Sequence, residues 1–152
     1  MRKVFLLFAL FLGLSTLTQA QSHSKELFTA VIKNKAADAD ALLTAGADAN
    51  APVEMMPGFP TTFLIMAAGS GHLEVVKTLV KHKAQVDKPD SFQATALMAA
   101  ASNGSLEVVT FLLAHGASPK AKDKDGKDVL ASAKEGGNAQ VIALIEQKLK
   151  AS

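Results

Sequence analysis

The most constraining feature of this sequence is a segment that occurs twice, 33 residues apart. Ala67–Asp87 reads AAGSGHLEVVKTLVKHKAQVD and Ala100–Lys120 reads AASNGSLEVVTFLLAHGASPK. The positions that match carry mostly glycine, leucine, valine and alanine, which turn and pack a chain. A period of this length carried by small and apolar residues is typical of a stacked array of repeats, in which one unit cannot bury its apolar face alone and at least three must stack.

The same register extends to both sides of the two copies. Leu64, Leu97 and Leu130 are successive positions of the period, and Asn138 is placed to cap a final helix. The pattern predicts an all-α solenoid of about four helix-turn-helix repeats, at about 25–50, 57–89, 90–122 and 123–150. We expect its helices at about 25–32, 36–43, 62–69, 73–82, 95–102, 106–115, 130–135 and 139–149.

One connection departs from the period. Residues 51–61 read APVEMMPGFPT, and the step from Leu27 to Leu64 is about four residues longer than the repeat. Three prolines and a glycine predict an irregular loop. Because it also carries Met55, Met56 and Phe59, two interpretations stay open. These side chains either form a binding surface or fold back and plug the N-terminal half of the array.

The first twenty residues are typical of a secretory signal peptide. Arg2 and Lys3 precede the apolar run Val4–Leu14, and the small and polar residues Ser15–Ala20 follow. The run is too short to span a bilayer, which takes about 20 apolar residues. We therefore expect export through the Sec pathway, cleavage after Ala20, a mature domain of residues 21–152 in the periplasm, and no membrane attachment after cleavage.

Charge and cysteine content exclude several functions. Without Arg2 and Lys3 the chain has 14 basic residues, all lysines, against 14 acidic residues. Nucleic-acid binding requires a basic face, so we expect no nucleic-acid partner. The absence of cysteine excludes disulfides, thiolate metal sites and a cysteine nucleophile. No cofactor and no metal are expected.

The repeated residues resemble the ankyrin repeat. Gly71–Val76 reads GHLEVV and matches the family motif fully. The family's threonine, its alanine pair and its closing Gly-Ala-Asp are matched by residues in several repeats: Thr62, Thr95, Ala67, Ala68, Ala100, Ala101, Gly46, Ala47 and Asp48. The family's proline and histidine are absent from their usual places, which hold Phe63 and Ile65 in the first internal repeat. The last repeat has Asp128 in place of threonine.

The resemblance implies a binding module, in which partners dock on the tips of the connections and on the exposed side of the first helices. Met55 and Met56 join these positions as exposed apolar candidates on the long connection. The predicted protein-binding residues are Met55, Met56, Phe59, Ser70, Phe92, Ser102, Asn103, Lys124 and Lys127.

The leading functional hypothesis is a non-enzymatic protein that binds and inhibits a periplasmic enzyme. The chain is similar in size and export signal to small exported ankyrin proteins with which predatory bacteria inhibit their own cell-wall endopeptidases. One alternative is a scaffold that supports a periplasmic oxidative-stress enzyme such as a catalase. Another is a metal-dependent enzyme that uses His72, His82 or His115.

Overall fold

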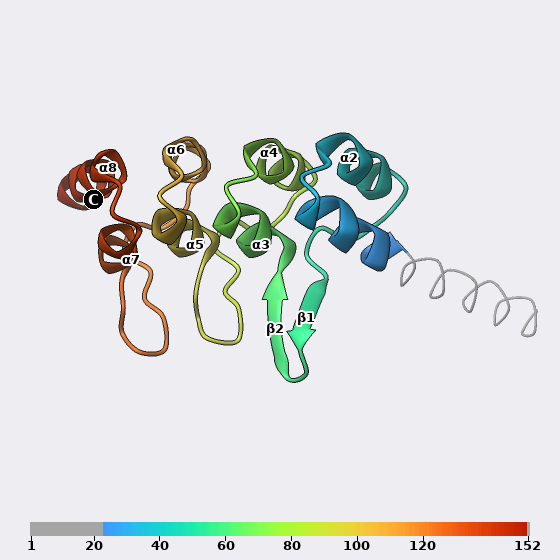
Figure 1. Ribbon diagram of the computed structural model, residues 1–152, viewed down its shortest axis with the longest axis horizontal. Helices are drawn as coiled ribbons and strands as arrows, with labels where there is room; N and C mark the ends of the chain where they lie inside the picture. Colours follow the sequence, from blue (N-terminus) through green and yellow to red (C-terminus); the bar gives the residue numbers. More distant parts are fainter. Residues whose placement is uncertain (1–22, 152) are drawn as a thin grey trace, which may run out of the picture.

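The computed structural model describes residues 23–151 as a row of four helix pairs (Figure 1). The second helices of the pairs form one layer and the first helices form the other, with the N- and C-terminal pairs at opposite ends. The predicted solenoid of helix pairs is confirmed. Its pairs are residues 23–32 with α2 (Ala36–Thr44), α3 (Phe63–Gly69) with α4 (Leu73–Lys81), α5 (Ala96–Asn103) with α6 (Leu106–Ala114), and α7 (Val129–Gly136) with α8 (Ala139–Ala151).

The ends of the inner helices follow from single residues. Thr62 and Thr95 cap α3 and α5, where each hydroxyl accepts a hydrogen bond from the backbone three residues on. Asp128 does the same for α7, with its carboxylate 2.8 Å from the Ala131 nitrogen. The exchange of threonine for aspartate therefore preserves the cap. At the other end, Gly104 follows α5 with a φ of 71°, a conformation that glycine adopts without strain.

The core runs along the stack. Leu64, Leu97 and the alanines Ala67, Ala68, Ala100, Ala101 and Ala133 of the first helices are at most 2% exposed. Buried valines of α4 and α6 belong to the same core. Small side chains allow neighbouring first helices to lie close together. The tightest approach is at Gly136, where an added Cβ would lie 2.7 Å from the Ser102 carbonyl oxygen and closer still to that of Ala101. The alanine-rich composition is thus a requirement of the stacking.

Three connections project on the same side of the row, below the first helices in Figure 1, and we call them the first, second and third fingers (residues 51–62, 86–95 and 119–128). The first finger is a β-hairpin, so the predicted irregular loop is wrong. β1 (Pro52–Met56) pairs antiparallel with β2 (Phe59–Thr62), with an irregularity between Glu54 and Met56.

The prolines do not prevent this hairpin because each lies where a strand needs no N–H. Pro52 begins β1, and Pro57 with Gly58 forms the tight connection, in which Gly58 has a φ of 82°. Pro60 lies in β2 with its carbonyl directed at the second finger, away from β1. Proline content alone therefore misidentified a hairpin as a loop.

Polar contacts at repeat spacing join neighbouring pairs. The Asn50 amide donates to the Lys83 carbonyl, and its oxygen accepts from the Gln85 nitrogen. Asn138 caps α8 through the Gln140 nitrogen, as predicted, and its amide also donates to the Gly104 carbonyl.

The predicted signal peptide, residues 1–20, lies outside the described residues. Within residues 23–151, no helix has both the length and the apolar character needed to cross a bilayer.

Candidate functional site

Four large apolar side chains are exposed on the first two fingers. Met55, Met56, Phe59 and Phe92 are 65%, 57%, 47% and 48% exposed. Of the apolar residues in the hairpin, only Val53 reaches the core, at 6% exposed. The plug interpretation therefore does not hold for Met55, Met56 and Phe59. We call these four residues the apolar tip surface.

Phe59 and Phe92 hold this surface together across the gap between fingers. Their ring centroids are 5.3 Å apart and their planes differ by 2°. The backbones are joined as well, because the Ser91 nitrogen donates to the Pro60 carbonyl at 3.0 Å. Offset stacking and a backbone hydrogen bond make the two tips one unit.

An aspartate folds each of the later fingers. Asp90 Oδ1 accepts hydrogen bonds from the Phe92 and Ala94 nitrogens at 2.8 and 2.9 Å. Asp123 Oδ1 accepts from the Asp125 and Lys127 nitrogens at 3.0 and 2.9 Å. These hydrogen bonds fix the turns of both fingers. The carboxylate of Asp90 thus positions Phe92 beside Phe59.

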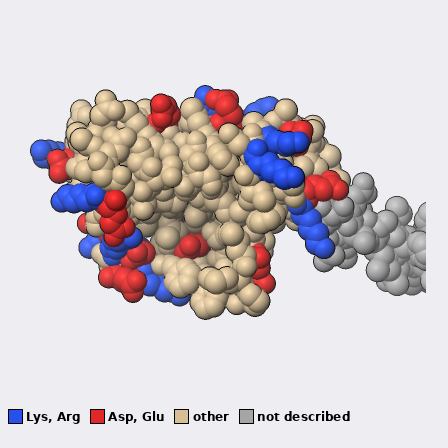
Figure 2. Space-filling view, viewed as in Figure 1, with Lys and Arg blue, Asp and Glu red and all other residues tan. Residues whose placement is uncertain are grey.

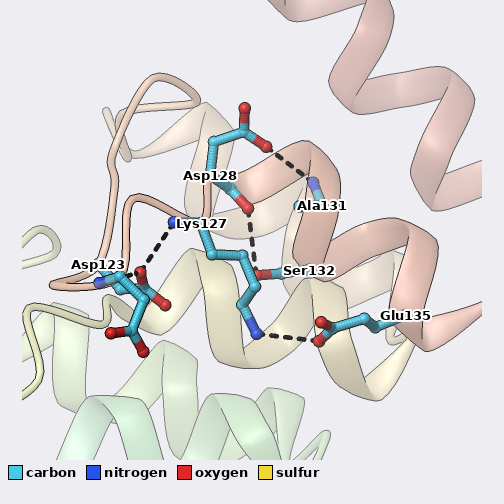
Figure 3. Close-up of polar contacts among 7 residues, drawn as sticks. Asp123, Lys127, Asp128, Ala131, Ser132 and Glu135 are labelled. Carbon is cyan, nitrogen blue, oxygen red and sulfur yellow. Dashed lines mark hydrogen bonds and ion pairs between the residues drawn. The ribbon is translucent and has the colours of Figure 1, made fainter.

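The third finger is charged where the first two are apolar. The Lys127 ammonium lies 2.9 Å from Glu135 Oε2 on α7 (Figure 3). This hydrogen bond raises the pKa of Lys127, and the carboxylates of Asp123 and Asp125 add to the effect. Charged side chains gather around this finger, whereas few cover the first two (Figure 2). The predicted Lys124 and Lys127 therefore belong to a polar margin beside the apolar tip surface.

The remaining predicted residues lie apart from the tips. Ser70 follows the C-terminal end of α3, and Ser102 and Asn103 end α5. All three are exposed. The fingers join the opposite, N-terminal ends of these helices, and eight helical residues span about 12 Å. The structure therefore places the predicted set in two groups, one at the finger tips and one at the far ends of the first helices.

The histidines each contact a different part of the array. His72 Nδ1 donates to the Val31 carbonyl, His82 Nε2 donates to Asp40 Oδ1, and His115 Nδ1 donates to the Phe111 carbonyl. Within the part of the chain that the structure describes, no three His, Asp or Glu side chains are grouped to hold a metal.

The sequence-based site prediction omitted Asp90, although Asp90 and Asp123 are 33 residues apart and in phase with the repeat. That spacing could have identified both as turn formers. It also omitted Asp40, whose carboxylate accepts from both Lys81 and His82. No sequence signal links Asp40 to α4, because the contact depends on how two helix pairs stack.

Comparison with protein families agrees with this architecture. A family model described as ankyrin repeats, in three copies, matches residues 27–123, more than half of the chain. The chain belongs to the ankyrin-repeat family, whose members generally mediate protein–protein interactions and are typically non-catalytic. A search of curated proteins finds no match.

Proposed function

We propose that the protein is a non-enzymatic binding module that docks on a periplasmic enzyme through the apolar tip surface. The observation that carries this proposal is the exposure of Met55, Met56, Phe59 and Phe92 on adjoining fingers. Large contiguous apolar patches are uncommon on monomers and mark interaction sites. Aromatic side chains and methionine also bury a large area on binding, and methionine adapts to an irregular partner surface.

The charged third finger provides a margin for orientation. Lys127 pairs with Glu135 on α7, and the finger that carries it is joined to the second finger by the hydrogen bond from the Lys124 nitrogen to the Phe92 carbonyl. Charged groups at the rim of an interface affect association rate and orientation more than affinity. Lys124 and Lys127 would accordingly influence how fast the partner binds, and the apolar tips would determine how tightly.

The proposed partner is a cell-wall hydrolase such as a peptidoglycan endopeptidase, which the protein would inhibit for self-protection. Two features support an inhibitor. The first twenty residues have the pattern of a signal peptide, which would direct the chain to the compartment of such enzymes. The hairpin also projects from the helix row (Figure 1), and Met55, Met56 and Phe59 lie next to its turn, a shape that can enter an active-site cleft.

Co-purification from periplasm, followed by a peptidoglycan-hydrolysis assay, tests this proposal. We expect a hydrolase to be retained and its activity to fall when the purified protein is added. The double variant Phe59→Ala with Phe92→Ala should relieve the inhibition and keep the helical circular-dichroism signal. If a hydrolase is retained but keeps full activity, the inhibition hypothesis is contradicted. If a catalase is retained and loses activity when this protein is absent, the scaffold hypothesis is supported instead.

A further inference from the structure

The outer edge of β1 is the open end of a hydrogen-bonded row. The Lys124 nitrogen of the third finger donates to the Phe92 carbonyl of the second, and the Ser91 nitrogen donates to the Pro60 carbonyl in β2. β2 in turn pairs with β1. The row thus runs from the third finger to β1, and no described segment pairs with β1 on its other side.

Glu54 presents the free backbone groups of this edge. The Pro60 carbonyl points toward Ser91, and in an antiparallel ladder both backbone groups of a residue point to the same side. Glu54 lies opposite Pro60 in the ladder. Because the backbone groups of Pro60 point away from β1, the two residues exchange no hydrogen bonds. The N–H and C=O of Glu54 must therefore point outward. Within residues 23–151, no backbone hydrogen bond from outside the hairpin reaches either group.

A cleft of about 400 Å³ lies beside this edge. Its walls come from the first helix, from β1 and from Phe63, and include Phe28, Val53 and Glu54. Phe63 and Val53 are buried core residues that form the apolar part of the wall. A strand that paired with Glu54 would place its neighbouring side chains over this cleft, because side chains alternate between the faces of a strand.

We propose that the outer edge of β1 binds an extended segment of the partner protein by strand addition. The residue opposite Glu54 would be lysine or arginine, since the exposed Glu54 carboxylate has no cationic partner among the described residues, and its two neighbours would be apolar and lie over the cleft. Self-pairing of β1 about Glu54 is disfavoured because it sets two carboxylates opposite each other. This inference rests on the proposed function only in requiring a protein partner.

The backbone can be tested separately from the side chain. Glu54→Pro removes the outward N–H together with the carboxylate, and proline is tolerated on an edge strand where its nitrogen faces solvent. Glu54→Gln is the matched control that removes the charge and keeps the N–H. The probe is the synthetic peptide acetyl-Thr-Val-Lys-Val-Thr-amide, titrated into the purified ¹⁵N-labelled protein by NMR.

We expect saturable shifts at the Glu54 amide and around Val53 and Phe28. Glu54→Pro should raise the Kd of the peptide by about tenfold or more, because the complex loses a main-chain hydrogen bond and the cleft contacts that accompany it. Glu54→Gln should raise the Kd of the peptide by about two- to fivefold, as expected for the loss of one cross-strand charge pair. A peptide N-methylated at its lysine should fail to bind, which tests the Glu54 carbonyl without altering the protein.

Three outcomes overturn the inference. The first is that the peptide causes no NMR shift at Glu54. The second is that Glu54→Pro or methylation of the peptide leaves the affinity unchanged. The third is that the free protein dimerises through β1 as its concentration rises. A co-purified enzyme that binds Glu54→Pro normally but not the Phe59→Ala, Phe92→Ala variant would refute strand addition and leave the proposed function intact.

Discussion

Phe59 and Phe92 form an offset stack across two fingers although 33 residues separate them in the chain. Both rings are about half exposed, so the stack orders an apolar surface that faces solvent. A surface ordered before binding loses less conformational entropy when a partner covers it. The repeat period therefore sets the geometry of the candidate docking site as well as the packing of the helices.

A double-mutant cycle on this pair should show direct coupling. For Phe59→Leu and Phe92→Leu, we expect a coupling of about 0.5 kcal/mol in the free energy of unfolding, the lower end for aromatic pairs because these rings are partly exposed. Phe111 lies on α6 and contacts His115. The cycle of Phe59→Leu with Phe111→Leu is the control and should be additive; equal coupling in both cycles would argue against the stack.

Asp90 should determine the order of the second finger. Asp90→Ala leaves the Phe92 and Ala94 N–H groups without their acceptor, and we expect a loss of about 1–3 kcal/mol in stability. Asp90→Asn keeps an oxygen acceptor and should lose less. Hydrogen exchange at these two amides measures the effect directly. Unchanged protection in Asp90→Ala would show that the turn is held by other contacts.

Gly136 should tolerate no side chain. A Cβ there would collide with the carbonyls of Ala101 and Ser102 on α5, so Gly136→Ala should destabilise the protein by about 1–3 kcal/mol in denaturant unfolding. Gly69→Ala is the matched control. Its Cβ would lie 3.5 Å from the Ala99 Cβ, an ordinary contact, so stability should stay equal or rise slightly. Similar losses in both variants would contradict the close approach.

The contacts of Asp40 should make stability sensitive to acid. The hydrogen bond from Lys81, and then that from His82, lowers the pKa of Asp40 below its ordinary value of 3.8. A lowered folded-state pKa gives a contribution that is present above 3.8 and is lost as the pH falls through the lowered value.

Thermal melts of the protein and of Asp40→Asn should therefore differ at neutral pH and converge in acid. The difference should be small because Asp40 is exposed to solvent. Asp38→Asn, on the same helix, removes a 3.4 Å contact with Lys35 and a first-turn charge but leaves the contacts of Asp40 in place, and it serves as the control. A gap that persists unchanged in acid would mean that the carboxylate charge of Asp40 is not its source.

Much of the fold could be predicted because the decisive interactions are local or repeat in phase. Thr62 and Thr95 cap helices within three residues of themselves, and Ala67 and Ala100 are buried at equivalent positions. The hairpin is not predictable in this way, because prolines disfavour strands and a sequence does not show the direction in which each N–H points. The hairpin depends on the Pro60 carbonyl pointing toward the second finger, where it accepts a hydrogen bond from the Ser91 nitrogen.

The candidate site was predictable only in part for the same reason. Phe59 and Phe92 could be chosen as in-phase aromatic residues at exposed positions, but their contact required the fingers to be placed. The separation of Ser70, Ser102 and Asn103 from the tips reflects which end of each helix a residue occupies. The contact of Asp40 with His82 joins residues outside the repeat spacing, so periodicity carries no information about it.

The directional bonding of the fingers bears on how such a chain can lengthen during evolution. The second and third fingers each donate one backbone N–H to a carbonyl of the preceding finger. A duplicated unit of about 33 residues inserted next to residue 122 would therefore find a carbonyl acceptor on the finger before it and offer one to the finger after it. A duplicated first finger would have no such freedom. Its second strand directs the Pro60 carbonyl at the second finger, and among the described residues its first strand pairs with β2 alone. Growth of the array by duplication is therefore expected at its C-terminal half.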